Sequence, residues 1–161
     1  MSAAWQKNNF LTIFTMKIQS PVFEQNQPIP AKYTCDGDNV SPPLVILEVP
    51  EEAASLVLIC DDPDAPAGTW VHWTLWNMSP NTKEIPENSA PAGASEGTTS
   101  FGNTGYGGPC PPSGAHRYFF KLYALDKTLD LPPAAQTEQL QEAMEGHILE
   151  SAELIGIYTK G

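Results

Sequence analysis

The sequence predicts a mainly β fold, a sandwich of strands with a few helical additions. Short runs of apolar, β-branched and aromatic residues follow one another from residue 16 to residue 125, as is typical of successive strands. One later segment has the four-residue spacing of apolar side chains that indicates a helix. This order argues against alternating βαβ units. With 161 residues, the chain has the size of one domain.

The first strands along the chain are the weaker predictions. Residues 16–23 and 44–49 are strand-like segments bracketed by prolines, which suits the edges of a sheet. Residues 55–60 form a nearly continuous apolar run, which suits a strand buried on both faces. Residues 70–78 form an aromatic strand with two largely apolar faces, which indicates a central position in its sheet. In this strand, two-residue alternation places His72 on the face opposite Trp73.

The C-terminal elements begin with a strand at residues 116–125, in which His116 and Tyr118 share one face. A helix is predicted after residue 133 from the spacing of Leu140, Met144, Ile148 and Ala152. His147 falls within this helix, where we expect a structural role. A last short strand is predicted over residues 154–159.

Residues 79–115 form a long connection without a sustained helical or strand period. These 37 residues hold six of the 16 prolines and seven of the 12 glycines. Loops of this length are uncommon in compact domains and usually functional. The mixture of glycine, proline and aromatic residues in 101–114 indicates a loop of defined shape rather than a flexible linker.

Charge and cysteine content exclude several classes of function. Nineteen acidic and eight basic residues give a net charge of −11, which opposes binding to nucleic acid or to anionic membranes. No apolar run is long enough to cross a membrane. The three cysteines, Cys35, Cys60 and Cys110, are an odd number without CxxC spacing, which argues against a disulfide framework. We therefore expect a cytoplasmic protein in a reducing compartment.

Four polar residues stand at strand ends or in apolar strands, where sheets commonly place binding sites: Asp62, Asp64, His72 and His116. Around them the sequence holds an ordered set of motifs: Lys32-Tyr-Thr-Cys-Asp-Gly, Ser41-Pro-Pro-Leu, Asp62-Pro-Asp-Ala-Pro66, Trp70-Val-His-Trp, Gly107-Gly-Pro-Cys-Pro-Pro-Ser-Gly-Ala-His-Arg-Tyr118, Leu122-Tyr-Ala-Leu-Asp126 and Gly146-His-Ile-Leu. In these motifs and their order the sequence closely resembles the phosphatidylethanolamine-binding protein family, in its bacterial and archaeal branch of Raf-kinase-inhibitor-like proteins.

The resemblance implies an antiparallel two-sheet sandwich with Greek-key connections over residues 16–161. Residues 1–15 would be an N-terminal extension, or Met16 the true start. It also implies a surface pocket for small phosphate-type anions such as phosphoryl headgroups and nucleotides. The implied ligand-binding residues are Asp62, Asp64, Trp70, His72, Gly108, Pro109, His116 and Tyr118.

Physical chemistry makes such a pocket plausible. No lysine or arginine lies between Lys83 and Arg117, so histidine and backbone N–H groups must hold the anion. The aspartates are expected to hold His72 or His116 in its charged donor form, so that affinity falls as the pH rises through the histidine titration. By strand alternation, Arg117 points to the opposite face and forms a structural ion pair.

We expect no catalysis, cofactor, metal ion or stable membrane association, and the oligomeric state, monomer or homodimer, is open. Three other functions stay open at this stage. A metal site could use two histidines and a carboxylate. A hydrolase could use Cys110 as nucleophile, although a packing thiol in a turn fits better. A regulatory module could inhibit an unknown protein partner, such as a kinase or protease, through the rim of the pocket.

Overall fold

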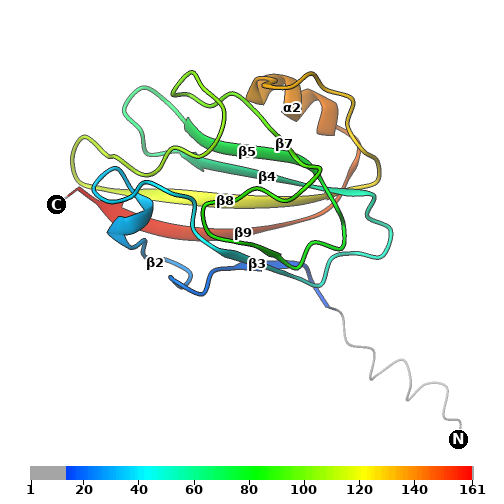
Figure 1. Cartoon of the computed structure of the whole chain (residues 1–161), viewed down its shortest axis with the longest axis horizontal. Helices are drawn as coiled ribbons and strands as arrows, with labels where there is room; N and C mark the ends of the chain where they lie inside the picture. The colour runs from blue at the N-terminus through cyan, green and yellow to red at the C-terminus, as the bar shows by residue number, and fades with distance from the viewer. Residues whose placement is uncertain (1–13, 161) are drawn as a thin grey trace, which may run out of the picture.

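The computed structural model describes residues 14–160, so residues 1–13 of the predicted extension lie outside the described part. It confirms a mainly β architecture of two sheets with one short α-helix near the C-terminus (Figure 1). None of the helices described is long and apolar enough to cross a membrane.

The larger sheet has six strands in the order β2-β9-β8-β4-β5-β7. Its long strands are β4 (Ser55–Asp62), β5 (Trp70–Met78), β8 (Ala115–Leu125) and β9 (Ile148–Thr159). Two short strands, β2 (Gln27–Pro28) and β7 (Ser95–Glu96), lie at its edges. Pairing is antiparallel except between β2 and β9, which run parallel. Every residue of β4 is buried, as its unbroken apolar run predicts.

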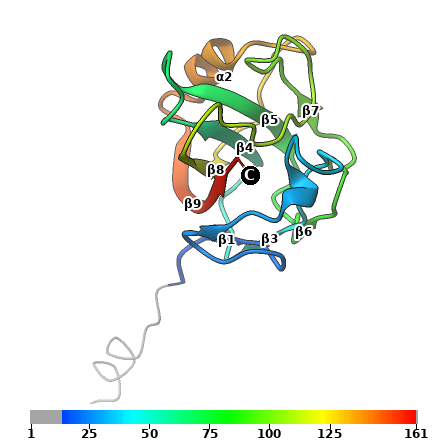
Figure 2. The ribbon, with the colours of Figure 1, turned by 90° about the vertical axis from the view of Figure 1, so that its left-hand side faces the viewer.

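The smaller sheet has the strand order β1-β3-β6 and covers one face of the larger sheet (Figure 2). Its strands are β1 (Lys17–Gln19), β3 (Leu44–Leu47) and β6 (Glu84–Ile85). β1 is shorter than the strand predicted at residues 16–23, and β3 is shorter than the strand predicted at residues 44–49. Apolar side chains from both sheets form the main core, among them Ile18, Ile46, Leu58 and Phe120. A 3-10 helix, η1 (Ala31–Tyr33), follows β2.

The opposite face of the larger sheet is covered at one end by helix α2 (Thr137–Met144). Leu140 and Met144 pack there against Val57, Ile59 and Trp76. The prediction that the helix extends through Ile148 and Ala152 is wrong. The helix ends before Gly146, whose φ of +78° favours glycine, and Ile148 begins β9. His147 therefore lies between helix and strand.

A β-bulge in β5 changes the direction of His72. Cys60 of β4 pairs with Trp73, but Asp61 pairs with Val71, so His72 has no direct partner on β4. The His72 ring contacts Tyr118, which belongs to the same core cluster as Trp73. The predicted alternation, with His72 and Trp73 on opposite faces, is wrong because the bulge turns both toward the inner side of the sheet.

Residues 79–114 are a long connection, one residue shorter than predicted, and among named strands only the two-residue β6 and β7 interrupt it. The end of this connection and the loop after β4 gather at the end of the molecule where the C-terminus lies (Figure 1).

Candidate functional site

A pocket of about 240 Å³ opens where β4 ends and where β5 and β8 begin. We call it the anion pocket after the expectation from the sequence, and its wall is completed by the loop after β4 and by the loop before β8. The lining residues are Asp62, Ala65, Pro66, Trp70, His72, Phe101, Cys110, Pro111, Pro112, His116 and Tyr118. Five of the eight predicted binding residues therefore meet in one cavity: Asp62, Trp70, His72, His116 and Tyr118.

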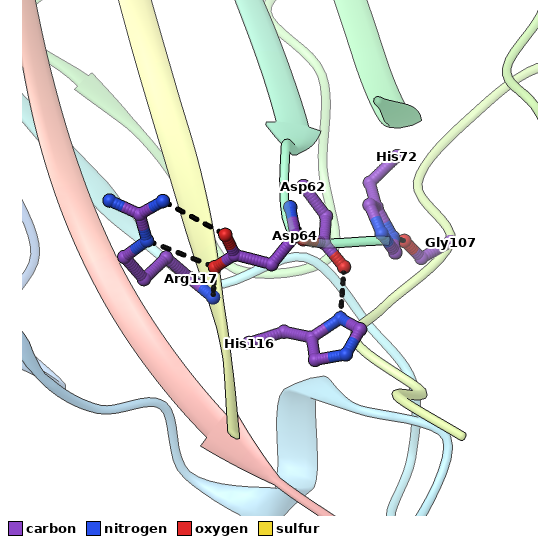
Figure 3. Close-up of polar contacts among 6 residues, drawn as sticks. All are labelled: Asp62, Asp64, His72, Gly107, His116 and Arg117. Atoms are coloured by element: carbon purple, nitrogen blue, oxygen red, sulfur yellow. Dashed lines mark hydrogen bonds and ion pairs between the residues drawn. The ribbon is translucent and has the colours of Figure 1, made fainter. Parts of the chain in front are cut away.

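Asp62 and His116, which both line the anion pocket, form a buried pair (Figure 3). The Nδ1–H of His116 donates to Oδ2 of Asp62 at 2.7 Å, and both side chains are less than one-tenth exposed. The backbone N–H of Asp64 donates to the other carboxylate oxygen of Asp62, also at 2.7 Å. This second bond closes a local turn within the Asp-Pro-Asp sequence. Asp62 is thus held from two sides and fixes the orientation of the His116 ring.

His72 is oriented by backbone rather than by a carboxylate. Its Nδ1 lies 2.6 Å from the carbonyl oxygen of Gly107, and since a carbonyl only accepts, Nδ1 carries the hydrogen. Burial lowers the pKa of His72 below the ordinary 6.5, although the Gly107 carbonyl and the Asp62 charge oppose this shift. His72 is therefore neutral near pH 7, which differs from the charged form expected from the sequence.

Aromatic side chains form the walls between and above the two histidines. The buried Tyr118 ring lies 5.2 Å from the His72 ring and 6.5 Å from the His116 ring, centroid to centroid. Burial and the nearby Asp62 charge raise the pKa of Tyr118, so its hydroxyl stays protonated. At the rim, Trp70 is 38% exposed and Phe101 is 44% exposed, and their rings meet edge to face at 5.4 Å.

Asp64 has a different partner from the one expected. It binds Arg117 through two side-chain contacts of 2.9 and 2.8 Å, and it also accepts the backbone N–H of Arg117. These hydrogen bonds lower the pKa of Asp64 from 3.8 to about 2. The predicted structural ion pair of Arg117 is therefore confirmed, but the prediction that Asp64 orients a histidine is wrong. Figure 3 shows this pair on the side of Asp64 away from both imidazole rings.

Gly108 and Pro109 do not line the anion pocket but join its wall to the loop after η1. The Gly108 N–H donates to Oδ1 of Asn39 at 2.8 Å, and the Pro109 carbonyl accepts from Cys35. A Cβ atom on Gly108 would lie 2.4 Å from that Asn39 oxygen and 2.4 Å from the Tyr33 carbonyl oxygen. This close approach explains why the position requires glycine.

The prediction that the cysteines stay unpaired is wrong. Cys35 and Cys110 form a disulfide with a Cα–Cα distance of 5.4 Å, whereas Cys60 is a buried free thiol. The odd count arises from this third cysteine, and a separation of 75 residues hides the pair from any spacing rule. Cys110 is therefore neither a free packing thiol nor an available nucleophile, and the inference of a reducing compartment loses its basis.

Sequence reasoning missed six residues of the pocket wall, namely Ala65, Pro66, Phe101, Cys110, Pro111 and Pro112. Four of them belong to the loop at 101–114 that was predicted to have a defined shape, and Ala65 and Pro66 belong to the motif Asp62-Pro-Asp-Ala-Pro66. Phe101 packs against Gly107, where a Cβ atom would lie 2.5 Å from the Phe101 ring. This contact becomes visible only in the folded chain, because the two positions lie six residues apart in the sequence.

The size of the anion pocket suits a small ligand rather than a long one. The volume lies below the roughly 300–1,000 Å³ of pockets that enclose drug-sized ligands. Among residues 14–160, no three histidine, cysteine or carboxylate side chains gather in a group able to hold a metal ion. A larger cavity of about 550 Å³ lies between β1 and β9, lined by Lys17, Glu24 and Glu153 among others, and no histidine lines it.

Comparisons with known proteins agree with this fold. A family model described as phosphatidylethanolamine-binding protein matches residues 19–159. A UPF0098 protein of Methanothermobacter thermautotrophicus is 52% identical over 151 residues, which cover 91% of this chain and 100% of the relative.

Two crystal structures are similar as well. CT736 of Chlamydia trachomatis, described as a homologue of phosphatidylethanolamine-binding protein, has a TM-score of 0.88 and 45% identity, over 91% of this chain and 99% of CT736. Escherichia coli YbcL, described as a member of the mammalian family, has a TM-score of 0.86 and 27% identity, over 92% of this chain and 100% of YbcL. The chain therefore belongs to the phosphatidylethanolamine-binding protein family.

Proposed function

We propose that this protein binds small phosphate-type anions in the anion pocket and acts as a regulatory binding protein without a catalytic step. One observation carries the proposal. The Nδ1 atoms of His72 and His116 are both engaged, by Gly107 and Asp62, while no protein group in residues 14–160 hydrogen-bonds either Nε2. Two fixed rings in a small pocket thus keep one nitrogen each for a ligand.

The charge of the pocket determines how an anion is accepted. Arg117 is occupied by Asp64, and no lysine or arginine lines the pocket. Asp62 brings a negative charge, so a second anion requires a compensating proton on a histidine or on the ligand itself. Phosphate monoesters have a second pKa of about 6, close to that of histidine. We therefore expect the pocket to take up a proton together with its anion.

The rim of the pocket favours a phosphate that carries a small organic group. Trp70 and Phe101 expose aromatic surface at the rim, where the Phe101 ring lies 5.4 Å from the His72 ring, and such surface attracts alkylammonium groups. Phosphorylethanolamine combines both features and corresponds to the name of the family. The pocket has no room for acyl chains, so the proposal concerns free headgroups rather than membrane lipids.

Isothermal titration calorimetry with phosphorylethanolamine and with inorganic phosphate tests the proposal. Replacing His116 by Ala removes one hydrogen bond to a charged ligand, which we expect to weaken binding about 10- to 100-fold. His147→Ala is the matched control. His147 Nδ1 contacts Asp126 at 2.8 Å, as His116 contacts Asp62, but this pair is exposed and does not line the pocket.

Equal losses in the two variants, or no heat from either phosphate compound with the wild-type protein, would contradict the proposal. Stronger binding of phosphorylethanolamine than of inorganic phosphate would support the role of the aromatic rim. Equal affinities would limit recognition to the phosphate group.

A second candidate function, inhibition of a protein partner through the pocket rim, is favoured by the exposed pair Trp70 and Phe101. Large exposed aromatic side chains commonly dominate protein interfaces. A pull-down with wild type, a Trp70→Ala/Phe101→Ala variant and a His72→Ala/His116→Ala variant tests it. A partner lost only with the rim variant indicates rim recognition, whereas a partner retained by all three contradicts it.

A further inference from the structure

The Cys35–Cys110 disulfide lies at the edge of the anion pocket and is open to solvent. Cys110 lines the pocket, and both cysteines are exposed, in contrast to Cys60, which is 2% exposed. The disulfide therefore joins one wall of the pocket to the loop after η1 at a position that a dissolved thiol can reach.

The pocket wall depends on this bond because hydrogen bonds hold the chain before Cys110 but not directly after it. Before it, hydrogen bonds fix the chain: Tyr106 Oη donates to the Tyr33 carbonyl at 2.7 Å, and Gly108 donates to Asn39 at 2.8 Å. After it, residues 111–114 make no hydrogen bond with any other part of residues 14–160, until β8 begins at Ala115. Pro111 and Pro112, which line the pocket, belong to this segment. Apart from the packing of the buried Pro111, the disulfide is thus the last tie of the wall before β8.

Lys160 places a positive charge beside the bond. Its Nζ lies 3.6 Å from Sγ of Cys110 and 3.8 Å from Sγ of Cys35. A neighbouring ammonium group stabilises a thiolate, and a stabilised thiolate is a better leaving group in thiol–disulfide exchange. Asp36 Oδ1, 3.8 Å from the same Nζ, helps to hold the Lys160 side chain in place.

We propose that the Cys35–Cys110 disulfide is a redox switch that controls the affinity of the anion pocket for phosphate compounds. This inference rests on the proposed function. The reductant is a dithiol: one thiolate attacks Sγ of Cys35 and releases the Cys110 thiolate beside Lys160. The second thiol then attacks the mixed disulfide and releases Cys35. Two electrons and two protons pass to the cysteine pair, and the reductant leaves as its disulfide.

The experiment compares phosphorylethanolamine binding by the full chain before and after treatment with dithiothreitol under native conditions. Mass spectrometry after alkylation should show two additional modified cysteines in the reduced protein, with Cys60 protected in both states. Loss of the tie leaves residues 110–114 to be ordered on binding, which we expect to weaken affinity about two- to tenfold. A Cys35→Ser/Cys110→Ser variant should bind like the reduced protein, whatever the redox state of the buffer.

A pair of charge variants tests the role of Lys160. Lys160→Gln should slow the native reduction, whereas Lys127→Gln, which removes an exposed lysine outside the pocket, should not. Equal rates in the two variants would overturn the role assigned to Lys160.

The remaining outcomes separate the switch from the binding function. Equal affinity of fully reduced and oxidised protein overturns the switch and leaves the proposed function intact. Loss of the native NMR spectrum on reduction also overturns it, because the bond would then only stabilise the fold. Absence of binding in both states refutes the proposed function and the switch with it.

Discussion

Removing the Cys35–Cys110 disulfide should lower the stability of the fold by an amount that follows from its place in the chain. The bond closes a loop of 75 residues. The chain-entropy relation for a loop of this length gives about 4.5 kcal/mol at 25 °C. Domains of this kind are stable by roughly 5–15 kcal/mol, so the native state should remain the more populated one. The hydrogen bonds of Tyr106 and Gly108 also remain to hold the loop.

Urea denaturation followed by circular dichroism measures this effect. With a urea slope of about 2 kcal/mol per molar, within the usual range, the Cys35→Ser/Cys110→Ser variant should unfold about 2 M earlier than the oxidised wild type. Dithiothreitol should move the wild-type midpoint toward that of the variant and leave the variant unchanged. A shift below about 0.5 M would refute the reasoning, since it would mean that the loop is not closed by this bond in the folded protein.

Three further predictions follow from the site. Gly108→Ala should destabilise the fold by about 1–3 kcal/mol, because its Cβ would lie 2.4 Å from the Tyr33 carbonyl oxygen; an unchanged melting temperature would contradict this. Arg117→Gln should cause a small loss of stability at neutral pH, which disappears as the pH falls from 3.8 toward 2. There Asp64 becomes protonated in the unfolded and then in the folded state, and denaturation midpoints against pH measure the convergence. Affinity for phosphorylethanolamine should rise as the pH falls below 6.5, since a bound anion favours protonated His72; calorimetry that finds affinity independent of pH would exclude this coupling.

The long strands of the larger sheet were predictable because their signal is local. The β5 boundaries are those expected, β8 begins one residue earlier, and β4 extends two residues further, to Asp62. Continuous apolar and aromatic runs suffice for such strands. The end of the helix was not recognised, because Ile148 and Ala152 fit a helical spacing as well as a strand. Gly146 was the local signal for termination.

The features of the site that were missed depend on tertiary structure. The direction of His72 follows from a bulge opposite Asp61, and a bulge has no period in the sequence. The disulfide depends on two loops that the fold brings together from 75 residues apart. The Asp62 carboxylate accepts the backbone N–H of Asp64 and so closes a turn. This turn directs the Asp64 side chain toward β8, where it pairs with Arg117. The family resemblance predicts the site residues, whereas their hydrogen-bond partners come from other strands and loops that only the folded chain brings together.

The central claim, that His72 and His116 hold a phosphate-type anion, is tested most directly by NMR of the histidine rings. Titration with phosphorylethanolamine should move the ring signals of His72 and His116, raise the pH at which His72 titrates, and leave His147 unchanged. The exposed His147–Asp126 pair serves as an internal reference in the same sample. Equal movement of all three rings, or movement of none at saturating ligand, would contradict the account.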